Sequence, residues 1–173
     1  MDNELRILML EDDANDAGLI VTLLKRSGLE FSHTIVSDKT SFLSALATNS
    51  YDVLLADNSL PQFSSTEALK VVRDRWVNLP FILVTGTVSE EFAANIIQQG
   101  ADDYVLKSNL KRLPTAISQA IERRNIMKAR QQAEDSLRLS ELRYRTLVEQ
   151  ASDGIIVSDY QGGILEVNSY ACI

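Results

Sequence analysis

Several charged or hydroxyl-bearing side chains end or directly follow short apolar runs in the first 110 residues. They are Glu11, Asp12, Asp13, Asp57, Thr85 and Lys107. If each apolar run is a strand of one parallel sheet, these side chains meet at its carboxyl edge, where such sheets bind ligands. Carboxylates beside a hydroxyl and an amine form a hard, oxygen-rich site that suits Mg²⁺ and phosphate oxygens. Because clustered carboxylates repel one another, we expect a divalent cation to stabilise this site.

Alternating strand-like and helix-like segments must position these residues. Apolar or alternating runs predict strands at residues 5–10, 31–36, 51–56, 81–84 and 103–106. Amphipathic patterns between them predict helices at 13–26, from 38 onward, at 64–76 and at 89–99. Asp38 and Ser89 are typical N-caps, and Gly28 and Gly100 are typical helix ends. Five such units with short connections predict an α/β fold with a doubly wound, five-stranded parallel sheet covered on both faces.

The composition is that of a globular protein with an acidic balance. Of the 173 residues, 45% are hydrophobic and 24% are charged, and these fractions exclude a disordered or collagen-like chain. The net charge is -7. The single cysteine (Cys172) and the single histidine (His33) exclude an intrachain disulfide and any metal site that needs two imidazoles. The apolar runs fall short of a membrane span, and the acidic start differs from a signal peptide. We therefore expect a cytoplasmic protein that does not contact a membrane.

No glycine or proline lies between Pro114 and Gly154, and the pattern of this stretch is helical. It begins with one apolar stripe. A second stripe, a heptad-like seam whose residues are alternately four and three positions apart, follows out of phase with the first. The seam residues are Ile126, Arg130, Ala133, Leu137, Ser140, Tyr144 and Leu147. This seam favours a long helix that pairs with a second copy of the chain, over a single helix packed on its own domain. Residues 111–145 carry 9 basic and 4 acidic side chains, and this interleaving favours a solvated linker over a nucleic-acid contact.

The residue pattern changes from helical to strand-like after residue 150. Two strand-like runs at residues 154–158 and 164–167 flank a turn and predict a β-hairpin. A lone two-stranded hairpin is marginally stable in water. The last residues therefore resemble the beginning of a second domain.

Four motifs in the first part of the chain resemble a two-component response-regulator receiver domain. They are Ile-Leu-Met-Leu-Glu-Asp-Asp at 7–13, Asp-Val-Leu-Leu-Ala-Asp-Asn-Ser-Leu-Pro at 52–61, Phe-Ile-Leu-Val-Thr-Gly at 81–86 and Gly-Ala-Asp-Asp-Tyr-Val-Leu-Lys at 100–107. The resemblance covers about residues 4–124 with the motifs in order, and it implies a flavodoxin-like sheet. It also implies a phosphorelay role, in which the domain accepts a phosphoryl group from a histidine kinase or a phosphotransfer protein.

The resemblance assigns roles to the carboxylates. Asp57 would be the phosphoacceptor, attacking a phosphoryl group that is carried on a partner's phosphohistidine. Glu11 and Asp12 match the acidic pair that binds Mg²⁺ together with Asp57, and the backbone carbonyl of Ser59 would complete the protein's ligands. Each position also has a plainer structural interpretation, since Asp12 could simply cap the following helix.

The resemblance also assigns roles beyond the metal ligands. Lys107 would pair with phosphoryl oxygens, Thr85 would hydrogen-bond one of them, and Tyr104 would swing inward when Thr85 moves. Two positions depart from the family pattern. Ser108 replaces the proline that commonly follows the lysine through a cis bond, and Ser65 replaces a glycine in the loop after the phosphoacceptor.

Residues 141–171 resemble the opening of a PAS sensor domain, from Glu-Leu-Arg-Tyr-Arg-Thr-Leu-Val-Glu-Gln to Gly-Gly-Ile-Leu-Glu-Val-Asn. We therefore expect a receiver at residues 1–124, a helical signalling linker at 125–143, and an N-terminal α+β fragment of a PAS domain at 144–173. The part of a PAS fold that would line a ligand pocket is absent, so the PAS resemblance implies no cofactor.

Two other functions compete with the phosphorelay role. An aspartate-nucleophile phosphohydrolase would also use a strand-end Asp, a Thr and a Lys with Mg²⁺, but that class needs a second Asp two residues after its nucleophile, where this chain has Ser59. A phosphorylation-independent interaction domain would keep the fold without the switch. We expect a receiver that phosphorylates and dephosphorylates itself rather than a turnover enzyme.

Overall fold

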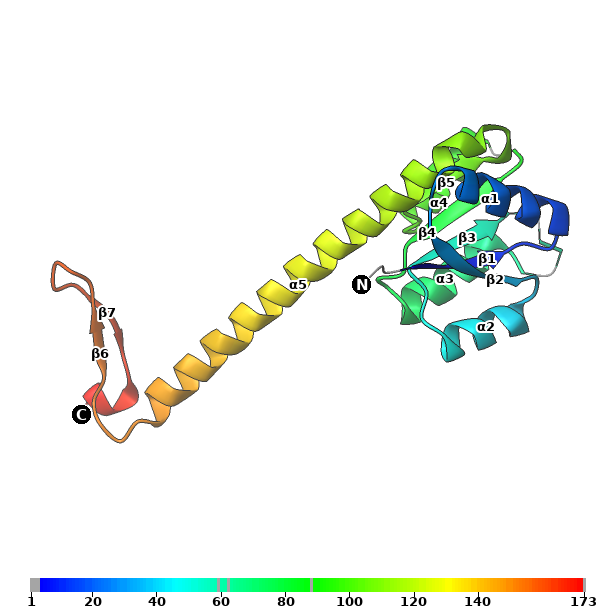
Figure 1. Ribbon diagram of the computed structural model, residues 1–173. Helices are drawn as coiled ribbons and strands as arrows, with labels where there is room; N and C mark the ends of the chain where they lie inside the picture. Colours follow the sequence, from blue (N-terminus) through cyan, green and yellow to red (C-terminus); the bar gives the residue numbers. More distant parts are fainter. Residues whose placement is uncertain (1–3, 59, 62, 88, 173) are drawn as a thin grey trace. The chain divides into compact units, whose positions relative to one another are not determined.

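The computed structural model describes residues 4–58, 60–61, 63–87 and 89–172 (Figure 1). The chain divides into two compact units, Met1–Ile126 and Met127–Ile173. The boundary falls within helix α5 (Leu113–Gln150), two residues after the predicted receiver–linker boundary. In the part that the structure describes, no helix has the length and apolarity that crossing a membrane requires.

The N-terminal unit is built on a five-stranded, all-parallel sheet in the order β2-β1-β3-β4-β5. The strands are β1 (Leu5–Leu10), β2 (Phe31–Val36), β3 (Val53–Asp57), β4 (Phe81–Thr85) and β5 (Asp103–Leu106). The chain order reverses between β1 and β3, so the doubly wound fold class is confirmed. In such sheets a crevice opens at the carboxyl ends of the strands beside the reversal.

Helices cover both faces of this sheet (Figure 1). They are α1 (Ala14–Arg26), α2 (Lys39–Thr48), α3 (Ser65–Arg75), α4 (Glu90–Gln98) and α5 (Leu113–Gln150). Side chains of Asp13, Asp38, Ser64 and Ser89 accept backbone hydrogen bonds at the N-termini of α1 to α4. Each cap satisfies an N–H that has no partner within its helix, and this fixes where the helix begins.

Alternate side chains of the strands enter two separate apolar layers. Leu8, Leu54 and Leu83 pack on one face with residues of α2, α3 and α4. Ile7, Leu55 and their neighbours pack on the other face with residues of α1 and the first turns of α5. Because successive strand residues point to opposite faces, each strand is buried on both sides, and its end is held firmly in place.

A buried ion-pair network closes the amino edge of the sheet. The carboxylate of Asp102 accepts from Arg73 Nη2 at 2.8 Å, from Arg124 Nε at 2.6 Å and from the backbone N–H of Phe81 at 2.8 Å. Both guanidinium groups also bond the carbonyl oxygen of Gly100, which ends α4 with a φ of 105°. The network therefore fastens α3, the loop before β5 and α5 to one another.

Two details at the strand ends differ from the sequence prediction. The third strand begins at Val53 rather than at residue 51 and includes Asp57. Lys107 does not end β5 but begins a 3-10 helix, Lys107–Arg112. The described residues contain no cis peptide bond, so the Lys107–Ser108 bond is trans.

The C-terminal unit contains the exposed part of α5 and an antiparallel hairpin of β6 (Ile156–Ser158) and β7 (Ile164–Val167), followed by a 3-10 turn, Ser169–Cys172. The long helix and the hairpin are confirmed. Asn168 is fully buried, and its amide nitrogen donates to the carbonyls of Val148 and Asp153, at 2.9 and 3.0 Å. Its amide oxygen accepts from the N–H groups of Ile155 and Ala171, at 2.8 and 3.1 Å. One side chain thus joins the end of α5, the hairpin and the final turn.

Replacing Asn168 with alanine should release the hairpin from the end of α5. Each of these four backbone groups would lose a hydrogen bond, and a buried group left unsatisfied costs about 1–3 kcal/mol. The N–H of Ala171 keeps its bond to the backbone carbonyl of Asn168, so amide hydrogen exchange should accelerate most at Ile155, while the amides of β1 and β3 keep their protection. Gln132→Ala, at an exposed position of α5, is the matched control, and an unchanged exchange rate at Ile155 in Asn168→Ala would contradict this role.

Candidate functional site

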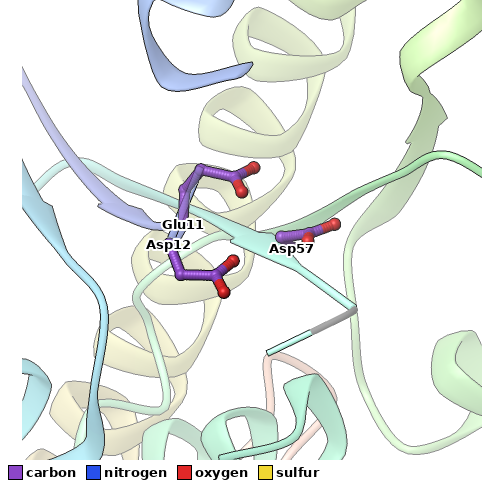
Figure 2. Close-up of side chains that lie close together, drawn as sticks. All are labelled: Glu11, Asp12 and Asp57. Carbon is purple, nitrogen blue, oxygen red and sulfur yellow. The ribbon is translucent and has the colours of Figure 1, made fainter. Parts of the chain in front are cut away.

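Three carboxylates from neighbouring strands gather at the carboxyl edge of the sheet (Figure 2). Glu11 and Asp12 directly follow β1, and Asp57 is the last residue of β3, which pairs with β1. One oxygen from each carboxylate lies within 4.8 Å of the other two. The parallel pairing of β1 with β3 brings Asp57 together with Asp12 and Glu11, which precede it by 45 and 46 residues in the sequence.

These carboxylates differ in their surroundings. Glu11 and Asp57 are buried, whereas Asp12 is exposed to solvent. Burial raises the pKa of Glu11, and the nearby negative charge of Asp57 raises it further. The hydrogen bonds that Glu11 accepts from Lys107 and from the backbone N–H of Asp13 act in the opposite direction, but the pKa stays above its usual value. The buried pair favours a cation at this edge, and the exposed Asp12 leaves one side open to water and to a ligand.

Lys107 supplies the positive charge beside the carboxylates. Its ammonium nitrogen lies 2.9 Å from Glu11 Oε2, 2.5 Å from Asp16 Oδ2 and 3.3 Å from Asp57 Oδ1. Burial alone would lower the pKa of Lys107, but the bonds to Asp16 and Glu11 and the charge of Asp57 outweigh it and raise the pKa. The amine is therefore charged at neutral pH.

Asp16 was not among the residues that the sequence suggested for the site. An acidic residue in the first turn of a helix is commonly explained by the helix dipole, and Asp16 lies in the first turn of α1. The sequence does contain one signal for this contact. Helix α1 begins directly after the acidic residues, and Asp16 follows Asp12 by four residues, so the first turn of α1 places Asp16 near the strand ends.

Thr85 and Tyr104 lie on the two strands beyond Asp57. Thr85 is the buried last residue of β4, and its hydroxyl donates to the carbonyl of Thr87 at 3.2 Å. Tyr104, on β5, packs half-buried against the apolar layer of α2, α3 and α4. The structure thus places Thr85 at the same sheet edge as the carboxylates and Tyr104 among apolar side chains. Ser59, the remaining predicted site residue, lies outside the described residues.

The donor set fits a small divalent cation. Glu11, Asp12 and Asp57 offer only oxygen atoms, and these are close enough to share one ion. Mg²⁺ prefers a few carboxylates and keeps several waters, which the exposed side of Asp12 can accommodate. The residues present therefore suit Mg²⁺. Lys107 lies where it can neutralise negative charge of the carboxylates that the cation leaves uncompensated.

The family model of the response regulator receiver domain matches residues 7–118 of this chain. The chain belongs to the response-regulator receiver family. A second family model, of the PAS domain, matches residues 142–173. The receiver match contains every site residue named above, and the PAS match contains the hairpin and Asn168.

Curated relatives resemble the receiver over a similar span. The chain is 35% identical over 118 residues to the sensory transduction protein RegX3 of Mycolicibacterium smegmatis, covering 68% of this chain and 50% of that protein. It is 29% identical over 121 residues to the cell cycle transcriptional regulator CtrA of Caulobacter vibrioides, covering 70% and 52%. The chain thus spans about half the length of these relatives.

Solved receiver domains share the fold. The receiver domain of a Francisella response regulator is 26% identical, with a TM-score of 0.61, and the match covers 69% of this chain and 98% of that one. A CheY-like receiver domain protein from Methanospirillum hungatei is 25% identical, with a TM-score of 0.63, over 72% and 99%. The match therefore covers nearly all of each solved domain.

In metal-free buffer, replacing Asp12 with asparagine should stabilise the receiver. The site carries more negative than positive charge, and this change removes one exposed member of the repelling set, so the free energy of unfolding should rise by about 0.5 kcal/mol. Urea unfolding at low ionic strength measures this. Asp74→Asn removes an exposed charge on α3, away from the site, and should have a smaller effect; equal effects of the two variants would argue against local repulsion.

Proposed function

We propose that this receiver is the phosphoacceptor of a two-component phosphorelay and takes a phosphoryl group onto Asp57 from a histidine kinase or a phosphotransfer protein. The observation that carries this proposal is the buried Asp57 carboxylate, which lies beside two further carboxylates and 3.3 Å from the Lys107 ammonium. A nucleophile, a metal-binding carboxylate pair and a fixed cation are the parts that phosphoryl transfer requires.

The transfer follows from these parts. An oxygen of Asp57 attacks the phosphorus atom, the bond from phosphorus to the partner's imidazole nitrogen breaks, and the electron pair of that bond remains on the imidazole. Lys107 compensates negative charge on the transferring group from a fixed position, so little reorganisation is needed. Glu11, Asp12 and Asp57 would hold Mg²⁺, together with the carbonyl of Ser59 that the family resemblance adds, and the bound ion would supply further positive charge for the phosphoryl oxygens.

Phosphorylation would change the surface of the receiver through Thr85 and Tyr104. The Thr85 hydroxyl donates to the loop carbonyl of Thr87 at 3.2 Å, a long hydrogen bond, so a phosphoryl oxygen on Asp57 can compete for it. Movement of Thr85 would open space toward β5, and Tyr104 would turn inward to fill it. This would alter the face formed by α4, β5 and the first turns of α5.

The competing functions lack a comparable observation. A phosphohydrolase would need an acid–base Asp at position 59, which is a serine. A phosphorylation-independent interaction domain would not need Lys107 ion-paired with three carboxylates at the sheet edge. The receiver would therefore form and lose its own phosphoryl group without turning over a separate substrate.

The proposal extends to the domain organisation of the chain. Residues 1–124 form the receiver, residues 125–143 a helical signalling linker, and residues 144–173 the beginning of a PAS domain. Because kinase phosphohistidines derive from cytoplasmic ATP, the receiver would act in the cytoplasm. The basic side chains of α5 alternate with acidic ones, so the proposal includes no nucleic-acid contact for these residues.

We also propose that two copies of the chain pair through the seam of α5. Ile126, Leu137, Tyr144 and Leu147 are exposed on this helix, and Leu137 and Leu147 each expose 71% of their surface. Exposed apolar side chains at spacings of three and four are typical of a helix that is covered by a partner.

Asp57→Asn should abolish phosphorylation by acetyl phosphate in the presence of Mg²⁺, because an amide oxygen is too weak a nucleophile. Intact-mass measurement should show one added phosphoryl group on the unaltered protein and none on Asp57→Asn or in excess chelator. Asp52→Asn, directly before the first residue of the same strand, should be labelled normally. Persistent labelling of Asp57→Asn, or steady hydrolysis of phosphate monoesters by the unaltered protein, would refute the proposal.

Replacing Leu137 and Leu147 together with glutamate should weaken dimerisation at least about tenfold for each buried leucine lost. Sedimentation at several concentrations measures the dissociation constant. Leu139→Glu with Leu142→Glu is the matched control, because these leucines are exposed on the same helix but lie off the seam. Equal behaviour of the two double variants would refute pairing through the seam.

A further inference from the structure

Asp16 makes the shortest contact of the Lys107 ammonium group. Its Oδ2 lies 2.5 Å from Nζ, compared with 2.9 Å for Glu11 and 3.3 Å for Asp57. An ammonium group has three N–H donors. Hydrogen bonds to Glu11 and Asp16 use two of these donors, and the ion pair with Asp57 at 3.3 Å holds the ammonium group from a third side.

The carboxylates that hold Lys107 are not equally free to release it. Glu11 is buried, and its other oxygen accepts the backbone N–H of Asp13, which fixes the carboxylate in place. Asp16 is at the solvent-facing rim of the site, with 38% of its side chain exposed, and it can be hydrated when the bond breaks. Of these partners, Asp16 is the one that Lys107 can exchange at least cost.

A phosphoryl group on Asp57 would draw the Lys107 ammonium group toward its oxygens, whereas the bonds to Glu11 and Asp16 hold the ammonium group where it is. A shift toward the phosphoryl oxygens would therefore weaken or break the bond to Asp16, the partner that is exchanged at least cost. Given the proposed phosphoacceptor function of Asp57, we infer that Asp16 is a positioning residue that holds Lys107 in the unphosphorylated receiver and competes with the phosphoryl group for it. Asp16 thereby weakens the hold of the site on any phosphoryl-like anion.

Beryllofluoride with Mg²⁺ tests this inference, because it mimics a phosphoryl group on Asp57 without a covalent reaction. Asp16→Asn should lower the half-saturating beryllofluoride concentration by about two- to fivefold, the range for a partly exposed ion pair. The ¹⁹F NMR signal of bound beryllofluoride measures it. Asp16→Glu, which keeps the charge within reach of Lys107, should return toward the unaltered value.

A second readout separates a bond to Lys107 from a general effect of charge. The ¹H–¹⁵N signal of the Lys107 ammonium group, assigned by its loss in Lys107→Arg, should shift and exchange faster with water in ligand-free Asp16→Asn. Asp52→Asn is the matched control, since Asp52 pairs with Arg6 at 3.3 Å away from this site. It should leave both the affinity and the Lys107 signal unchanged.

Each outcome decides the inference. Unaltered affinity in Asp16→Asn overturns it, and so does a higher affinity with an unchanged Lys107 signal, which would mean that Asp16 acts through its charge alone. If the unaltered protein binds no beryllofluoride, the proposed phosphoacceptor function has failed, and the role of Asp16 fails with it. Thermal unfolding of Asp16→Asn, with Asp16→Glu as the second variant, distinguishes these results from a folding defect.

Discussion

The balance of charge at one sheet edge is the constraint on which the rest of the receiver depends. Glu11 and Asp57 are buried carboxylates in adjacent strand ends, and an unpaired buried charge is costly. Lys107 offsets part of this cost, but its single positive charge serves three carboxylates. The surplus negative charge makes the edge receptive to a cation. The same surplus would oppose an incoming phosphoryl anion unless that cation is present.

A rigid framework is needed to keep these charges together. Both faces of β1, β3 and β4 are buried in apolar layers, so the strand ends cannot move apart without opening the core. The Asp102 network holds the opposite edge, where it links Arg73 and Arg124. Removing one partner from such a buried network leaves an uncompensated charge, which makes the network a strong constraint on the position of α5 within the receiver.

Most of the fold could be predicted from the sequence because its signals are local. Buried parallel strands are continuous apolar runs, and the caps Asp38 and Ser89 mark helix starts in the sequence itself. The carboxylate cluster could be predicted because strand ends of a parallel sheet share one edge. The contact between β1 and β3 then follows from the topology rather than from any property of Glu11 or Asp57 alone.

Other features depend on contacts between distant residues and carry no local signal. The 3-10 helix at Lys107 places the amine beside Asp16, and neither residue's neighbours in the sequence indicate that contact. Asn168 likewise has the pattern of an ordinary turn residue, although its amide bonds four backbone groups. The partners of Lys107 and of Asn168 depend on how the folded backbone brings distant residues together, so only the tertiary structure reveals them.

Helix α5 changes its source of stability along its length. Up to Ala120 its side chains are part of the apolar layer shared with α1, so packing fixes the helix there. From Met127 to Leu147 the side chains are exposed, and local terms remain, such as the Arg130–Glu134 pair at 2.8 Å. Such pairs contribute only about 0.3–0.5 kcal/mol each. Tertiary burial supplies most of the stability of ordinary protein helices. A partner that covers the seam would supply the burial that this stretch lacks within its own chain.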